Sequence, residues 1–258
     1  MTNYRSKYII WVCTNLSATK SLEGGVDIAR RKINTTKLQI LKVATEKFMT
    51  IGYSSTTLKM IGDELDTSSG HIGFYFPSKD EMLAVLVQML CDYQWKMIKE
   101  EANDGTSALL AICFELMTMA SACEENEVAK DFFISSYQSK KCLEIIHRND
   151  VARAKEVFAE YCSDWTDEQF EEAEILVAGI EYATLNASGD SVSLETRITG
   201  ALNTILNIYN VPEEIRRIKT EKVLAMNYRL LGKRIFEEFK EYVEKMNELA
   251  YEEKLKGN

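Results

Sequence analysis

The segment TSSGHIGFYFPSKDEM, from Thr67 to Met82, places small polar side chains directly before three consecutive aromatic ones. Small polar groups at the front of a helix would let it enter the major groove of DNA, which is about 12 Å wide. The aromatic side chains behind them could fix the angle of the helix and touch sugar, phosphate or thymine methyl groups. Lys79 and nearby backbone N–H groups could reach a phosphate. The segment is therefore typical of nucleic-acid recognition.

Catalysis requires titratable groups that converge on one place, and the sequence offers few of them. It contains only 2 histidines, His71 and His147. His71 belongs to the segment above, and His147 is expected near a helix end, in a solvated or dipole-stabilising role. The sequence has no phosphate-binding loop, metal-spaced cluster or nucleophile elbow. We therefore expect no catalytic residue, no metal and no cofactor, and a helical enzyme is the alternative from a different functional class.

Helices must position this segment, because only 2 prolines and 12 glycines interrupt the chain. A helical pattern of apolar residues begins where Thr36 and Gln39 form a capping box. Gly52 is expected to end this helix in the manner of a C-cap. Thr56 or Thr57 can cap a second, short helix.

A third short helix carries the polar front of the segment. Ser68 can cap it, and Ile72 and Phe76 are spaced to point inward. Pro77 stops this helix, and a long fourth helix is expected over residues 79–101. Two short helices joined by a tight turn predict a helix-turn-helix, whose second helix presents its polar residues outward.

The stretch ILKVATEKFMTIGYSSTTLKMIGDELDTSSGHIGFYFPSKDEML, Ile40–Leu83, closely resembles the tetracycline-repressor (TetR) family. Its hallmarks are Phe48, Gly52, Tyr53, Thr56, Thr57, Ile61, Gly62 and the run Phe76-Pro77-Ser78-Lys79 before an acidic pair. The stretch covers about one sixth of the chain. The resemblance implies an all-α homodimer with one head per subunit that binds a double-stranded DNA operator. Unrelated proteins also contain three-helix heads of this kind, but the Phe-Pro-Ser-Lys junction argues against them.

The resemblance also implies the DNA-binding residues. Carried over by position, they are Thr57, Lys59, Ser69, Gly70, His71, Phe74, Tyr75 and Lys79, the last as the phosphate lysine. Gly73 departs from the family pattern, which usually has a tyrosine there, so that backbone contact is missing or is made by Tyr75. Gly70 and Gly73 each weaken a short helix by roughly 1 kcal/mol relative to alanine. We expect the recognition helix to become firm only on DNA.

The charge distribution supports the same interpretation. The net charge is -9, yet residues 30–79 hold 8 basic and 4 acidic side chains, which is +4, so the rest carries −13. A basic module on an acidic body is expected where one module meets phosphates.

No apolar run approaches the roughly 20 residues of a membrane span, so no membrane partner is expected. The 6 cysteines lack a Cys-x-x-Cys pair, and we expect buried free thiols and a cytoplasmic location.

Three regions are expected along the chain. Residues 1–32 form an extension that is poorly ordered or loosely packed, or that is not translated natively if a purine-rich ribosome-binding sequence underlies Glu23–Gly25. Residues 33–80 form the DNA-binding head, and residues 81–258 form an effector-binding and dimerisation body. Its later helices are expected at 106–124, 127–147, 150–163, 167–187, 194–210 and 213–252.

Helices 167–187 and 194–210 are the expected dimer interface. Gly179, Ala183 and Ala187 leave a flat stripe where another helix can approach. An apolar face of four residues matches it: Ile198, Leu202, Ile205 and Tyr209. Packing within one subunit is the alternative, but the resemblance implies a two-fold four-helix interface.

The effector is expected to be a small molecule, apolar or aromatic in character. The residues on helices that line the ligand cavity in relatives are Trp95, Phe114, Met117, Phe132, Tyr137, Tyr161, Glu181 and Tyr182. Aromatic and methionine side chains suit adaptable pockets, although such residues also form ordinary cores. Glu181 could counter a cationic ligand or face solvent.

We expect a repressor that a ligand releases from a palindromic operator through helix 79–101, with an activator or a corepressor-type regulator as alternatives.

Overall fold

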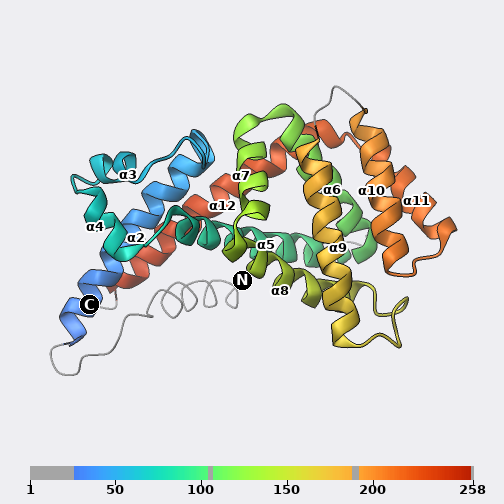
Figure 1. The fold of residues 1–258 in the computed structure, drawn as a ribbon, viewed down its shortest axis with the longest axis horizontal. Helices are drawn as coiled ribbons and strands as arrows, with labels where there is room; N and C mark the ends of the chain where they lie inside the picture. Colours follow the sequence, from blue (N-terminus) through green and yellow to red (C-terminus); the bar gives the residue numbers. More distant parts are fainter. Residues whose placement is uncertain (1–25, 104–106, 188–191, 257–258) are drawn as a thin grey trace.

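The computed structural model describes residues 26–103, 107–187 and 192–256, and this part of the chain is all-α, as the sequence predicts. Its helices are α2 (Val26–Thr50), α3 (Leu58–Glu64), α4 (Ser69–Tyr75), α5 (Lys79–Asn103), α6 (Ala108–Glu125), α7 (Glu127–Gln138), α8 (Lys140–Val157), α9 (Asp167–Asn186), α10 (Leu194–Ile208), α11 (Glu213–Leu224) and α12 (Tyr228–Lys256). Helices α2 to α4 form a head at one end, and the later helices form the body (Figure 1).

The head is built around a small apolar core. Phe48 of α2, Ile61 of α3 and Ile72 of α4 are fully buried together with Phe76, which follows α4. Burying one such side chain contributes about 1.5–3 kcal/mol, so these four residues hold the short helices that propensity alone would not stabilise. The predicted inward positions of Ile72 and Phe76 are confirmed.

The first helix begins earlier than the sequence analysis predicts. Helix α2 starts at Val26, so residues 26–32 are already helical. Thr36 lies within this helix, so it cannot form the predicted N-terminal capping box. No glycine or proline interrupts residues 26–51, which explains why the helix extends backwards. The expectation for residues 1–25 lies outside the described residues.

The predicted helix 127–147 is wrong, because the chain breaks at Ser139. Helix α7 ends at Gln138, and α8 begins at Lys140 and ends at Val157, short of the predicted 163. Ser139 adopts an extended conformation with ψ 120 and is neither glycine nor proline, so no strong local signal indicated the break. His147 consequently lies inside α8 rather than at a helix end, and burial lowers the pKa of its imidazole.

The predicted helix 213–252 is also divided, into α11 and α12, and the second part lies along the head. Helix α12 starts beside α6 in the body and then runs back along α2 (Figure 1). A Cβ atom at Gly232 would lie 2.8 Å from the carbonyl oxygen of Thr118, so only glycine allows α12 to approach α6 this closely. The far end of α12 buries Val243, Met246 and Ala250.

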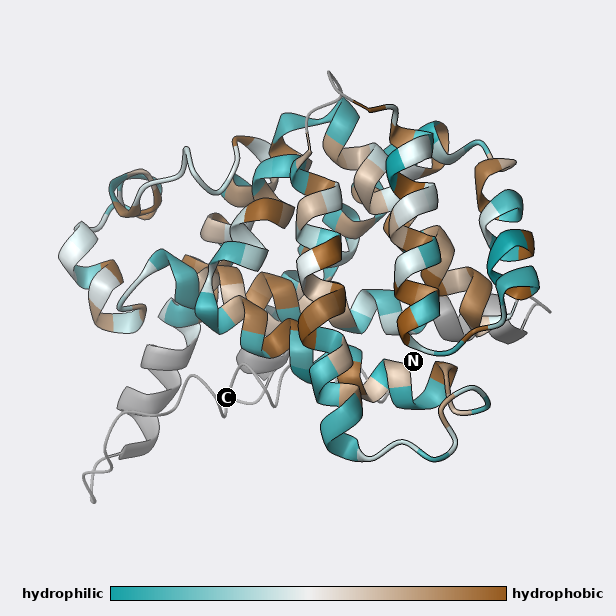
Figure 2. Cartoon of the chain, turned by 45° about the vertical axis from the view of Figure 1, so that its right-hand side comes forward, coloured by the Kyte–Doolittle hydropathy of each residue, from teal (hydrophilic) through white to brown (hydrophobic). Residues whose placement is uncertain are grey.

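Apolar residues concentrate on the inward faces of the helices, and polar residues cover the outward faces (Figure 2). The five cysteines among the described residues are free and buried, as expected, and Cys13 lies outside the described part. None of the helices that the structure describes combines the length and the apolar character that crossing a membrane would require.

Candidate DNA-binding surface and body cavity

The turn between α3 and α4 is fixed by a glycine. A Cβ atom at Gly62 would lie 2.7 Å from the carbonyl oxygen of Thr67, and the Thr67 N–H donates to the Gly62 carbonyl at 2.8 Å. Asp66 adopts a positive φ of 50, which completes the tight turn. Thr57 caps α3, since its side chain accepts a hydrogen bond from the Met60 N–H. The predicted helix-turn-helix is therefore present.

Helix α4 presents the recognition surface. Ser68 caps it by accepting from the His71 N–H at 3.1 Å, as the sequence predicts. Ser69, Gly70 and His71 are exposed, and Phe74 is 67% exposed.

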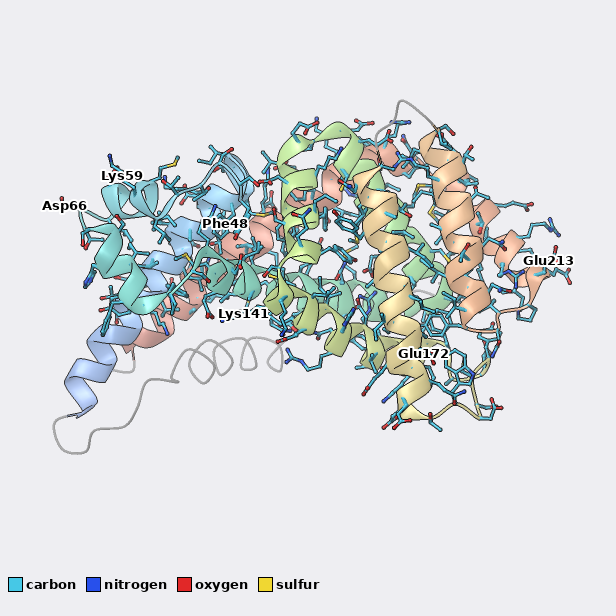
Figure 3. The ribbon with its side chains drawn as sticks, viewed as in Figure 1. Phe48, Lys59, Asp66, Lys141, Glu172 and Glu213 are labelled. Atoms are coloured by element: carbon cyan, nitrogen blue, oxygen red, sulfur yellow. The ribbon has the colours of Figure 1, made fainter. Side chains whose placement is uncertain are left out.

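The aromatic residues of α4 form a small cluster. The Tyr75 ring lies 5.2 Å from the rings of both His71 and Phe74, in edge-on contacts that stabilise such pairs. Because Tyr75 is half-buried, the cluster joins the exposed side chains to the head core. Thr57, which caps α3, and Lys59 within α3 are exposed beside this cluster. Lys59 and Asp66 lie at the edge of the head farthest from the body (Figure 3).

Lys79 is placed differently from the other predicted contacts. Its ammonium group donates to the carbonyl oxygens of Tyr53 at 2.8 Å and Thr56 at 2.7 Å, and lies 4.3 Å from the centre of the Tyr53 ring. An ammonium group has three donors, so one is left over from these two bonds. Burial lowers the pKa of Lys79, which reflects this half-buried position. The side chain clamps the loop between α2 and α3.

The same loop is tied to the body. Gly52 has a positive φ of 94, and a Cβ atom there would lie 2.7 Å from a carboxylate oxygen of Asp131 on α7. The Ser54 N–H and hydroxyl both donate to Asp131, the former at 2.8 Å. Tyr53 donates to Asp80 at 2.5 Å. The position of the head therefore depends on α5 and α7.

A cavity lies in the body between α5 and α10. Its volume is about 60 Å³. A single water molecule requires about 10–15 Å³ on this measure, so the cavity has room for several. A second cavity of about 50 Å³ shares Leu90, Gln94 and Phe133 with it, so the two adjoin. The second is almost entirely apolar and reaches α12 at Phe236 and Phe239.

The structure brings together three of the eight predicted ligand residues. Tyr137 and Glu181 line the larger cavity, where the Tyr137 hydroxyl donates to Glu181 at 2.7 Å, and Phe114 lines the smaller one. The remaining five line neither cavity: Trp95, Met117, Phe132, Tyr161 and Tyr182. Met117 and Phe132 are fully buried in the core. Glu181 lines the larger cavity, and whether it counters a cationic ligand stays a prediction.

Sequence reasoning missed several polar groups of the larger cavity. Glu174 lies seven positions before Glu181 on α9, in an otherwise apolar run. Seven residues make about two helical turns, so this spacing places both carboxyl groups on one face of the helix and was the available signal. The Tyr209 hydroxyl donates to Glu174. Arg153 and Asp150 reach the cavity from α8, and no short pattern in the sequence indicated them.

Of the residues predicted to form the dimer interface, those on α9 are exposed, whereas those of the α10 face are buried. Gly179 and Ala183 are exposed on α9, and Ile175, four residues before Gly179, is 61% exposed. Leu176 beside it is 54% exposed. The predicted matching face of α10 is wrong, because its four residues are buried within the subunit: Ile198, Leu202, Ile205 and Tyr209. The exposed stripe therefore belongs to α9 alone.

Comparison with known proteins agrees with the geometry of the head. Residues 40–86 match the family model described as bacterial regulatory proteins, tetR family. The chain is also 28% identical over 105 residues to the HTH-type transcriptional regulator HbdR of Aromatoleum sp. (strain CIB). That match covers 41% of this chain and 44% of the relative, so the chain spans less than half of the relative's length. No solved structure matches the chain.

Proposed function

Because residues 40–86 carry the DNA-binding domain of the bacterial tetR family of regulatory proteins, we propose that this protein is a ligand-responsive repressor. It binds a palindromic operator as a homodimer in the cytoplasm and leaves it when a small molecule enters the body cavity. The exposed face of α4, held by the buried Ile72 and Phe76, is the observation that carries the proposal. It is not an enzyme, and its DNA contacts are the eight residues assigned by resemblance.

Dimerisation through α9 supports binding to a palindrome. A two-fold interface places the same surface of each subunit in contact, and the stripe of Ile175, Gly179 and Ala183 offers a face without bulky polar groups. Two heads would then meet half-sites about 34–36 Å apart, or a multiple of that distance.

Ligand release is supported by elements that touch both the cavity and the head. Helix α5 begins at Lys79, which clamps the head loop, and continues to Leu90 and Gln94 at the cavity. Helix α7 holds the same loop with Asp131 and lines the cavity with Tyr137. A ligand that shifts either helix would change the spacing of the heads, and binding of ligand and DNA would oppose one another by about 1–3 kcal/mol.

The proposal can be tested by selecting operators from a library of random duplex DNA with the purified protein. We expect an enriched palindrome, bound by a dimer, with an affinity that falls steeply as salt increases. Failure to enrich any sequence would contradict the DNA-binding function. In a cell, placing the palindrome before a reporter gene should lower expression; raised expression would indicate an activator instead.

A further inference from the structure

The larger cavity contains more carboxylates than cations among the described residues. Four carboxylate side chains line it: Glu115, Asp150, Glu174 and Glu181. Arg153 supplies the one guanidinium group in the lining. It forms ion pairs with Glu115 and, at 3.2 Å, with Asp150, so both of its terminal nitrogens are occupied. The lining leaves no cation for Glu174 and Glu181.

Glu174 and Glu181 lie on one face of α9, seven positions apart, which corresponds to about 10 Å along the helix. Each accepts a hydrogen bond from one tyrosine hydroxyl, Tyr209 for Glu174 and Tyr137 for Glu181. A tyrosine hydroxyl does not neutralise a carboxylate. Burial raises the pKa of Glu174 to about 8 and the pKa of Glu181 well above its ordinary value, with nearby Asp150 adding to both effects. Each of these two carboxyl groups therefore holds a proton at neutral pH, and a cation that enters would lower their pKa values and take the place of that proton.

A second observation indicates that the cavity is built for an occupant. Arg153 is only 6% exposed, and its Nε is buried without a hydrogen-bond partner among the described residues. An unsatisfied buried donor costs about 1–3 kcal/mol, and an acceptor atom in the cavity would remove that cost. The cavity therefore has unmet hydrogen-bonding capacity as well as two carboxyl groups without a cation.

The remaining wall suits an apolar body with a positive charge. Phe133, Tyr137, Phe158 and Tyr209 line the cavity, and the rings of Phe158 and Tyr209 stack at 3.9 Å. Aromatic faces attract organic cations as well as apolar groups. A single metal ion fits poorly, because the described residues contain no cluster of three potential ligands.

We propose that the effector is an amphipathic organic cation, with an apolar or aromatic body, a protonated amine that binds between Glu174 and Glu181, and an acceptor atom that meets the Nε of Arg153. This inference rests on the proposed function, because it identifies the ligand class of the effector site. An anion of the same shape would meet four carboxylates, and a neutral molecule would gain only the apolar contacts.

Three probes with one common body separate these cases: phenylbutylamine, phenylbutanol and phenylbutanoate. Their affinities for the full chain are measured by calorimetry at neutral pH, without DNA. We expect the amine to bind at least about tenfold more tightly than the alcohol, and the acid to bind most weakly. Equal binding of the amine and the alcohol, tighter binding of the acid, or no binding of the amine would overturn the proposal.

Two isosteric variants, Glu174→Gln and Glu181→Gln, locate the effect. Each should reduce the preference for the amine over the alcohol by about tenfold or more while leaving affinity for the alcohol within about twofold. Glu172→Gln is the matched control, because this exposed residue lies on α9 outside the cavity (Figure 3). An undiminished preference in both variants would overturn the proposed site. Because no DNA is present, failure of operator selection would count only against the proposed function.

Discussion

The amide of Asn247, near the C-terminal end of α12, donates a hydrogen bond of 2.9 Å to the hydroxyl oxygen of Thr45 in α2. Both side chains are buried, and the Thr45 hydroxyl in turn donates to the Leu41 carbonyl at 2.9 Å. The bond joins residues 202 positions apart and fixes the register of the last helix on the first helix of the head.

Replacing Asn247 should therefore loosen the head from the body. We expect Asn247→Ala to lower the free energy of unfolding by about 1–3 kcal/mol, because it leaves the buried Thr45 oxygen without its donor. Urea unfolding measures this, and a double-mutant cycle with Thr45→Val should give a coupling of about 1 kcal/mol. Glu248→Ala, which changes an exposed neighbour, is the control. Additive effects of Asn247 and Thr45 would contradict the predicted coupling.

The clamp made by Lys79 predicts that this residue contributes to folding as well as to DNA affinity. Lys79→Met should destabilise the protein by about 1–3 kcal/mol, because the carbonyl oxygens of Tyr53 and Thr56 lose a charged donor. Thermal unfolding without DNA tests this, with the exposed Lys59→Met as the control. Unchanged stability together with weaker DNA binding would mean that the lysine serves only as a phosphate contact.

His71 lies exposed on the recognition helix, so its loss should affect sequence reading rather than folding. His71→Ala is expected to weaken binding to the selected operator by about 1–3 kcal/mol while the fold and the dimer remain intact. Binding to the operator and to random duplex DNA is compared at one salt concentration. Equal losses on both would defeat the direct-readout assignment.

Ala183 lies on the exposed stripe of α9, where a two-fold axis would bring it near its own copy. Ala183→Glu should dissociate the dimer by placing like charges across the interface. Sedimentation of the variant and the wild type at several concentrations measures the effect. A variant dimer as stable as the wild type would show that the subunits meet elsewhere. Ala159→Glu, at an exposed position after α8, is the control.

Glu174 predicts a specific pH dependence of stability. Its pKa is about 8 in the folded protein against 4.5 as the ordinary value, so on raising the pH the unfolded chain loses this proton first. The contribution of Glu174 to stability therefore falls between about pH 4.5 and 8 and is constant above. Relative to wild type, Glu174→Gln should gain up to about 1.4 kcal/mol per pH unit in this range.

Urea unfolding of both proteins at three pH values across that window tests the expectation. The difference between them reports Glu174 together with its electrostatic effect on Glu181, whose pKa it helps to raise. Glu172→Gln should show no such trend, because its side chain is exposed. A pH-independent difference between Glu174→Gln and wild type would contradict the prediction.

The all-α class and the helix-turn-helix of the head could be predicted from sequence patterns alone. The signals there are local: Ser68 and Thr57 cap helices, Gly62 permits a close turn, and Ile72 and Phe76 recur at helical spacing. Each of these depends on contacts within a few residues, so a pattern of neighbours suffices to read it. The break at Ser139 carried no such signal and was missed.

Contacts between side chains that are distant in the sequence became visible only in the three-dimensional fold. The sequence could not place Arg153 beside Glu115, bring Tyr209 to Glu174 or lay α12 along the head, because these contacts join positions far apart whose spacing no periodicity records. The apolar faces of α9 and α10 look alike as patterns, yet Ile198 is buried and Ile175 is exposed. Packing decides such cases, since hydrophobic periodicity indicates that a face must be covered but does not indicate by what.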